Sequence, residues 1–340
     1  MFMNFSKMIF LFFLFLGTSI SISSNSWLGA WMGLEINLMA FIPLMMNLNN
    51  MLMSEAALKY FLIQALASSI FLFSIILGFL HSQDGFLIEI DSLNQILINM
   101  ALFIKMGAAP FHFWFPSVME SLDWINGLIL MTWQKIAPLM LISYTINFNF
   151  FIFVIISSAL IGSIGGLNQT NLRTLMAYSS INHISWMLSS MFINENLWMT
   201  YYLFYVFLSL TIVFFCYNFQ IFFMNQLYSL MNANLLLKFM LLTNLLSLGG
   251  LPPFLGFMPK LLVIQLLTNK NMYFLVFILI MASLITLFFY IRVTFSAFML
   301  MYPSLKWNKL SIWHNLNWTL LLSSISLFGF SGISLVYNFI

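Results

Sequence analysis

Long apolar segments recur along the whole chain and constrain its fold more than any other feature. Of 340 residues, 62% are hydrophobic and only 6% are charged, whereas soluble domains carry about 25% charged residues. Polar side chains are too few to cover a soluble fold, so the bilayer is the expected solvent. Strands or irregular loops in lipid would leave backbone groups unpaired, which favours α-helices. The sequence therefore predicts an all-α polytopic membrane protein.

The polar, Gly and Pro clusters divide the chain into eleven candidate transmembrane helices. About 20 apolar residues are needed to cross a hydrocarbon core of ~30 Å at 1.5 Å per residue. The first segment resembles a signal peptide, but membrane segments follow it directly, so we expect it to be retained as a helix. The expected spans cover residues 5–23, 27–47, 55–80, 92–115, 125–145, 149–167, 172–191, 197–224, 237–269, 273–297 and 317–338.

The net charge, the cysteine count and the missing motifs argue against several kinds of binding site on this chain. The net charge of +3 is small and dispersed, which argues against nucleic-acid binding. Cys216 is the single cysteine, so neither a disulfide within the chain nor an iron–sulfur cluster bound by this chain alone is possible. Nucleotide-binding and zinc-hydrolase motifs are missing from the sequence. We expect no cofactor and no metal on this chain.

The distribution of basic residues predicts the orientation. An odd number of helices places the two chain ends on opposite sides of the membrane. With the N-terminus on the cytoplasmic or matrix side, that side receives most of the basic residues, as the positive-inside rule requires. The opposite side receives Lys270 and the acidic segment 81–91. The residues on the N-terminal side are Lys7, Arg173, Lys238, Arg292, Lys306 and Lys309.

Two of the expected helices are interrupted at matching places. Residues 105–110 (KMGAAP) interrupt the fourth helix, and residues 249–253 (GGLPP) interrupt the ninth. Proline removes a helical hydrogen bond, so each helix should break there. We therefore predict a single transmembrane domain, 1–340, built from inverted five-helix repeats over 5–145 and 149–297 plus a final helix. Paired broken helices in inverted halves point to a transport site; the alternative is two unrelated kinks.

Ionisable residues within the apolar segments are the candidate functional groups. Each lies in or beside an expected span, where a charge costs at least ~2.5–3.5 kcal/mol and commonly serves ion or proton transfer. The candidates are Glu35, Lys59, Lys105, Lys135, His183 and Lys260. Burial favours a neutral lysine and a nearby carboxylate favours the charged one, so such a series can relay protons. Candidate water-holding side chains are Gln64, Gln134, Tyr178, Ser179, Asn182, Asn244 and Ser247.

Simpler interpretations remain open for several of these residues. Lys59 lies near a helix start and could extend its ammonium group to the interface. His183 could be a hydrogen-bonded packing residue. Lys105 and Lys135 could form a purely structural ion pair with Glu35.

Six ordered motifs resemble the antiporter-like membrane subunits of respiratory complex I. The resemblance covers residues 27–270 densely, and the six motifs are specific as a set. They are Gly33-Leu-Glu-Ile-Asn-Leu38, Ser54-Glu-Ala-Ala-Leu-Lys-Tyr-Phe61, Phe103-Ile-Lys-Met-Gly-Ala-Ala-Pro-Phe-His-Phe-Trp114, Gln134-Lys-Ile-Ala-Pro138, Asn171-Leu-Arg-Thr-Leu-Met-Ala-Tyr-Ser-Ser-Ile181 and Ser247-Leu-Gly-Gly-Leu-Pro-Pro-Phe-Leu-Gly-Phe257.

The resemblance implies a function and a location. Family members carry a Glu and three Lys at the positions of Glu35, Lys59, Lys105 and Lys135, and a Lys at Lys260. The resemblance implies proton translocation driven by quinone reduction elsewhere in the complex. NADH, FMN, iron–sulfur clusters and ubiquinone would then be bound by other subunits. The implied partners are other membrane-arm subunits and lipids. The implied location is the mitochondrial inner membrane, with the N-terminus in the matrix and the C-terminus in the intermembrane space.

The resemblance also implies that this chain lacks three N-terminal helices found in longer family members, leaving a groove for a neighbour or lipid. Two competing hypotheses stay open. A free-standing cation/proton antiporter would need a site of several carboxylates, of which only Glu35 is deep. A structural scaffold subunit would merely pair its buried charges.

Overall fold

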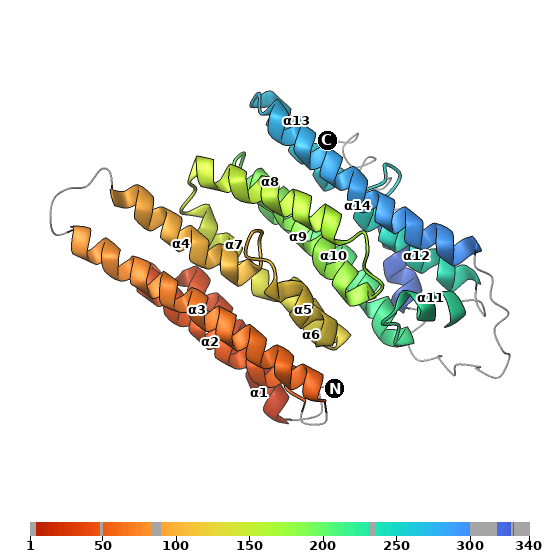
Figure 1. Cartoon of the computed structure of the whole chain (residues 1–340), viewed down its shortest axis with the longest axis horizontal. Coiled ribbons are helices and arrows are strands. Elements are labelled where there is room, and N and C mark those ends of the chain that lie inside the picture. The colour runs from red at the N-terminus through yellow and green to blue at the C-terminus, as the bar shows by residue number, and fades with distance from the viewer. Residues whose placement is uncertain are drawn as a thin grey trace. The chain divides into compact units, whose positions relative to one another are not determined.

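Helices make up nearly all of the structure, a computed structural model that describes residues 5–47, 50–82, 90–230, 235–299, 318–327 and 329. Residues 318–327 are helical and follow the last of the helices labelled in Figure 1. Within these described ranges, β-pairing is limited to an isolated bridge between Asn171 and Phe223. The helices are α1 (Phe5–Ser23), α2 (Trp27–Met45), α3 (Met51–Ser82), α4 (Ile90–Met106), α5 (Trp114–Ser121), α6 (Trp124–Met131), α7 (Trp133–Ser143), α8 (Phe148–Gly165), α9 (Leu172–Met191), α10 (Glu195–Phe219), α11 (Met224–Leu230), α12 (Leu235–Gly249), α13 (Phe257–Asn269) and α14 (Tyr273–Met299).

The predicted all-α membrane fold is confirmed. Seven helices within the described residues are long and apolar enough to cross a bilayer: α1, α2, α3, α6 with α7, α8, α10 and α14. The predicted count of eleven spans stays a prediction, because most of the last segment, 317–338, lies outside the described residues. The predicted span 172–191 corresponds to α9, which is long enough to cross but is rich in Ser and Asn.

Both predicted helix interruptions are present. The fourth predicted helix ends at Met106, and Gly107 follows with a positive φ of 73°. The ninth ends at Gly249, and Gly250 follows with a φ of 85°. Glycine adopts this left-handed backbone without steric cost, which is why a helix commonly stops there. Each interruption places a lysine close to a helix end: Lys105 at the end of α4, and Lys260 beside the end of α12.

Other predicted boundaries need correction. The predicted helix 125–145 is two helices, because Thr132 takes φ −110° and ψ −78° between α6 and α7. The predicted helix 197–224 ends at Phe219, where Gln220 takes a left-handed conformation. The predicted loop after residue 115 contains the short helix α5. The interruption at Thr132 and the end of α10 have no Gly or Pro at their boundaries, so the sequence carried no signal for them, whereas α5 has Pro116 in its first turn.

The chain divides into two compact units, Met1–Val154 and Ile155–Ile340, with the boundary inside α8. In the first unit, α1 packs against α2 at very short range. A Cβ added to Gly17 would lie 2.7 Å from the Asn37 nitrogen, and one added to Gly33 would lie 2.5 Å from the Ser21 nitrogen. Helix α3 then packs between α2 and α4, beside which it runs in Figure 1. That the two halves are inverted repeats remains a prediction.

Helix α9 is the core of the second unit. All of its residues except Arg173 and Tyr178 are buried. Its polar side chains therefore meet protein rather than lipid, and most of its serine hydroxyls donate to backbone carbonyls three residues earlier, as Ser185 does to Asn182 and Ser189 to Trp186. A buried polar group without a hydrogen bond would be costly, so this local bonding lets a polar helix occupy the centre of an apolar unit.

Candidate functional site

Lys105 lies at the point where α4 stops. It is 7% exposed, and its position is the last but one of the helix. The end of a helix leaves carbonyls without intrahelical partners, and side chains from other elements bind two of them. The Gln64 amide donates to the Lys105 carbonyl at 3.3 Å, and the Trp114 indole donates to the Ile104 carbonyl at 3.1 Å. These two side-chain hydrogen bonds stabilise the helix end and keep Lys105 in the interior of the first unit.

Lys135 lies in the first turn of α7, just after the Thr132 interruption. It is 1% exposed, one of the most deeply buried large side chains. Its ammonium nitrogen lies 5.0 Å from the centroid of the Phe115 ring. A desolvated cation over an aromatic face gains about 2 kcal/mol. Phe115 also packs under Gly107, where an added Cβ would lie 3.0 Å from its Cβ, so one aromatic ring contacts both helix interruptions of this unit.

A small polar cavity lies between α2, α3, α4 and α7. Its volume is about 10 Å³, which is room for about one water molecule. Asn37 and Gln134 bind each other across it through two amide hydrogen bonds, at 2.9 and 3.1 Å. The residues that line it are Leu34, Asn37, Leu38, Tyr60, Gln64, Lys105, Gln134 and Pro138. The predicted water-holding role of Gln64 and Gln134 stays a prediction, but both side chains lie where it requires them.

Glu35 lies beside this cavity on α2 and is half-buried. Within the described residues, Glu35 has no basic partner within 4.0 Å. The simple alternative of a contact ion pair between Glu35 and Lys105 is therefore not supported.

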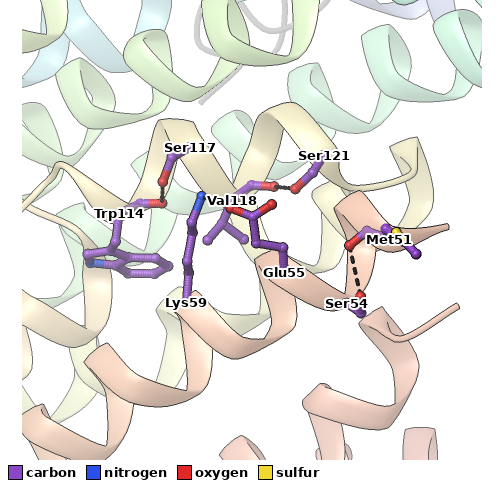
Figure 2. Close-up of polar contacts among 8 residues, drawn as sticks. All are labelled: Met51, Ser54, Glu55, Lys59, Trp114, Ser117, Val118 and Ser121. Atoms are coloured by element: carbon purple, nitrogen blue, oxygen red, sulfur yellow. Dashed lines mark hydrogen bonds and ion pairs between the residues drawn. The ribbon is translucent and has the colours of Figure 1, made fainter. Parts of the chain in front are cut away.

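Lys59 takes a different position from the other candidate lysines. Its ammonium group pairs with Glu55, one turn earlier, at 2.7 Å, and the two side chains are 50% and 60% exposed. Figure 2 shows both rising from α3 toward α5, where Trp114, Ser117 and Ser121 lie. Lys59 does not line the cavity, although its neighbour Tyr60 does. The structure thus separates Lys59 from the buried cluster.

The second unit carries Lys260 in the first turn of α13. It is 4% exposed, and its ammonium group donates to the Gly249 carbonyl at the end of α12, at 2.8 Å. The same nitrogen lies 5.9 Å from the centroid of the Trp186 ring on α9. Gly250 is required here, because an added Cβ would lie 3.0 Å from the lysine nitrogen. Lys260 therefore binds the backbone that the helix interruption exposes.

His183 lies on α9, one turn before Trp186, and contacts two tyrosines of α10. Its Nδ1 and the Tyr201 hydroxyl are 2.9 Å apart, and its ring centroid lies 5.0 Å from that of Tyr205. The Tyr201 ring stacks on Trp186 at 6.5 Å. The His183 and Lys260 side chains thus belong to one buried aromatic cluster. The hydrogen bond does not by itself exclude the packing role left open for His183.

The other predicted polar residues of the second unit have definite partners. The Asn182 amide donates to the Thr286 hydroxyl at 3.5 Å, and Asn244 accepts a short hydrogen bond from Ser326. The Ser247 hydroxyl donates to the Asn244 carbonyl at 2.7 Å. These contacts connect α9 and α12 with α14 and the helix over 318–327.

Sequence reasoning missed four cavity and cluster residues. Asn37, Tyr60, Tyr201 and Tyr205 contact the candidate groups, but only the folded neighbours reveal this. Lys238, predicted to lie on the N-terminal side of the membrane, is 4% exposed and its ammonium nitrogen lies 5.8 Å from the centroid of the Phe298 ring. The sequence did not indicate this contact, because the aromatic partner lies 60 residues away.

The described residues contain no group of three or more His, Cys, Asp or Glu side chains that could hold a metal ion.

Comparisons with known proteins agree on one family. The sequence model of the family described as NADH:quinone oxidoreductase/Mrp antiporter, TM matches residues 24–286. NADH-ubiquinone oxidoreductase chain 2 of Anopheles gambiae is 56% identical over 337 residues, 98% of this chain and 94% of the relative. The chain 2 protein of Aedes aegypti is 55% identical over 335 residues, 98% of each chain. A chain of respiratory complex I from Thermus thermophilus shares the fold, with a TM-score of 0.79, 23% identity, and coverage of 96% of this chain and 79% of that chain.

Proposed function

The chain belongs to the NADH-ubiquinone oxidoreductase chain 2 family, a membrane subunit of complex I, and from this premise we propose that it translocates protons through its buried basic residues. The NADH and quinone chemistry that supplies the energy takes place on other subunits. This chain contributes the groups that bind and release protons within the membrane.

The observation that carries the proposal is the Lys105 cavity. Lys105 lines a polar space of about 10 Å³ together with Asn37, Gln64 and Gln134, and Glu35 lies on α2 next to the lining residue Leu34. A lysine that shares a water-sized polar space and has a carboxylate on a neighbouring helix can lose and regain a proton with small movements of its neighbours. Lys135, which follows Gln134 directly in α7, is the next basic group along the chain.

In the second unit, Lys260 and His183 are the corresponding groups. Among the described residues, Lys260 contacts one backbone carbonyl and one aromatic ring. An ammonium group has three donors, so it can also bind water. Lys59 belongs to the proposed relay as an outer member, near the start of α3, where an ion pair with Glu55 holds it.

We further propose the setting in which this happens. The chain lies in the mitochondrial inner membrane, with its N-terminus in the matrix and its C-terminus in the intermembrane space. Its partners are other membrane-arm subunits, including further antiporter-like subunits, together with membrane lipids. Many large apolar side chains of α3 and α14 are exposed, including Leu62, Phe73 and Phe277, as contact with lipid or with neighbouring subunits requires.

The substitution Lys135→Met tests the relay against a structural role. Methionine keeps the volume of the side chain and its contact with Phe115 but cannot carry a proton. We expect coupled NADH:ubiquinone turnover of the assembled enzyme in vesicles to fall by about 10²-fold, the scale of a positioned proton-transfer group. The matched control is Lys270→Met, because Lys270 is exposed and binds only the Phe192 and Ile193 carbonyls. Normal assembly with the full proton-to-electron ratio in Lys135→Met would show that this lysine only fills space.

A further inference from the structure

A second, larger cavity lies in the first unit, at the end where α2 begins and α3 and α7 finish. Its volume is about 460 Å³, within the range of natural ligand and water pockets. No charged side chain is among its described lining residues. They are Trp27, Ser74, Ile75, Gly78, Phe79, Asn94, Gln95, Ile98, Tyr144 and Thr145. We call this cavity the α3–α4 vestibule.

The vestibule runs from the membrane interface toward the interior. Trp27 is the first residue of α2 and Tyr144 directly follows α7, and such aromatic residues are typical of the interface. At the inner end, Ser74 and Ile98 each lie about eight residues from the end of their helix, which is about 12 Å at 1.5 Å per residue. The vestibule therefore reaches well below the headgroups.

Its polar groups favour water over a lipid chain. Asn94 lines the vestibule and is only 9% exposed. A polar side chain away from bulk water is costly unless it is hydrogen-bonded, and water in the vestibule would supply those hydrogen bonds. Thr145 adds a second polar group to the lining, and it binds Asn99 through two hydrogen bonds at 2.5 and 2.6 Å.

An apolar layer separates the vestibule from Lys105. Along α4, Lys105 follows Ile98 by seven residues, about 10 Å. Ala101 and Leu102 lie between them and are completely buried, and Ile98 is 7% exposed. Protons do not cross such a dry layer, because water is needed to carry them. The layer is thin, about two helical turns.

We infer that the α3–α4 vestibule is a second aqueous approach to Lys105, closed at its inner end by Ile98, Ala101 and Leu102. This inference rests on the proposed relay for its purpose but not for the presence of water. Its lining carries no carboxylate or ammonium group, so the species it admits are water and the proton rather than a metal cation or an anionic ligand. Opening of the apolar layer would connect Lys105 with the side of the membrane at which α1 ends.

The first experiment tests for water. In the assembled enzyme, Asn94→Cys is compared with Leu93→Cys, whose side chain is 63% exposed on the outer surface of the same turn and lies outside the vestibule lining. The chain's own Cys216 is buried. A charged, membrane-impermeant thiol reagent should modify Asn94→Cys at least about tenfold faster, because the reactive thiolate forms where water solvates it. Equal or slower modification of Asn94→Cys would show that the vestibule does not contain water. A lipid chain in the vestibule would contradict the inference in the same way.

The second experiment tests the apolar layer. Ile98→Asn places a polar group in it, and Ile98→Val keeps it apolar as the control for folding. With the enzyme in vesicles, we expect Ile98→Asn to dissipate an imposed proton gradient faster and to pump fewer protons per NADH, while Ile98→Val behaves as wild type. If the assembled Ile98→Asn enzyme dissipates the proton gradient no faster than wild type and pumps as many protons per NADH, the apolar layer is not a gate. If Asn94→Cys is modified rapidly but Ile98→Asn has no effect, the vestibule contains water but does not lead to Lys105.

Discussion

The buried lysines and the exposed Lys59 differ in the groups that they contact. Lys260 donates to a backbone carbonyl at a helix interruption, and Lys135 lies over an aromatic ring. Neither contact is a carboxylate pair, which would fix the charge and oppose proton release. The Glu55–Lys59 pair is of that kind, and it lies on the exposed side of α3. These contacts of the deep lysines, unlike the carboxylate partner of the outer one, fit a relay whose interior groups change charge.

The hydroxyl of Tyr201 is predicted to position His183. Tyr201→Phe removes the oxygen 2.9 Å from Nδ1 but keeps the ring stacked on Trp186. One hydrogen bond contributes about 1 kcal/mol, so we expect coupled turnover to fall by about fivefold with unchanged assembly. The measurement is NADH:ubiquinone turnover across a pH series, beside Tyr217→Phe, an exposed tyrosine on the same helix. A pH profile identical to wild type would assign His183 to packing.

Residue-level prediction from the sequence succeeded for charges and failed for partners. A lysine or glutamate within an apolar segment is visible without coordinates, and Lys105, Lys135 and Lys260 are indeed buried. Their contacts are not visible, because Phe115, Trp186 and Gly249 are common residues in common contexts. Tyr201 was read as part of an ordinary apolar helix, since only the fold brings its hydroxyl to His183.

Helix packing in the first unit depends on glycine where two helices meet. Gly33 on α2 faces the backbone of Ser21 on α1, and Glu35 is two residues further along α2. An alanine methyl at Gly33 would approach that backbone nitrogen to 2.5 Å, and overpacking of this kind costs about 1–3 kcal/mol. The position of Glu35 is therefore tied to how closely α1 and α2 approach.

Gly33→Ala is expected to lower the amount of assembled enzyme and to disturb pumping through Glu35. Gly127→Ala is the matched control, because its added Cβ would meet only the flexible end of the Met119 side chain, at 3.2 Å. The measurement is the yield of intact complex on native gels, followed by turnover per assembled enzyme. Equal yields from the two variants would show that α1 and α2 can separate without cost.

Helix interruptions were predictable only where Gly and Pro cluster in the sequence. Gly107 and Gly250 take left-handed backbone conformations, and their Gly and Pro neighbours gave the signal. The interruption at Thr132 has no such residue, and Pro43 and Pro138 lie inside continuous helices. Proline in a membrane helix is tolerated when neighbouring groups satisfy the freed carbonyls. The deciding factor is therefore tertiary packing, which local sequence rules do not contain.

The predicted orientation is supported in the second unit by the charges at the two ends of α9. In the second unit, Arg173 begins α9 and Arg292 donates to the Leu167 carbonyl just before it. At the other end, Lys270 binds the carbonyls of Phe192 and Ile193 just after α9. More basic residues at the first end agree with a matrix location for that end. Lys238 weakens as an anchor because it is buried, whereas Lys306 and Lys309 lie outside the described residues.

Cysteines on either side of α9 test this orientation directly. Thr170→Cys and Asn194→Cys flank the helix, and both native side chains are exposed. The 20 residues of α9 extend about 30 Å, the thickness of a hydrocarbon core. In mitochondria stripped of the outer membrane, an impermeant thiol reagent should modify Asn194→Cys and leave Thr170→Cys unmodified; inverted vesicles should give the opposite result. Modification of both from one side would mean that α9 does not span. Reversal of the pattern would place the N-terminus in the intermembrane space, and the vestibule would then open toward the matrix.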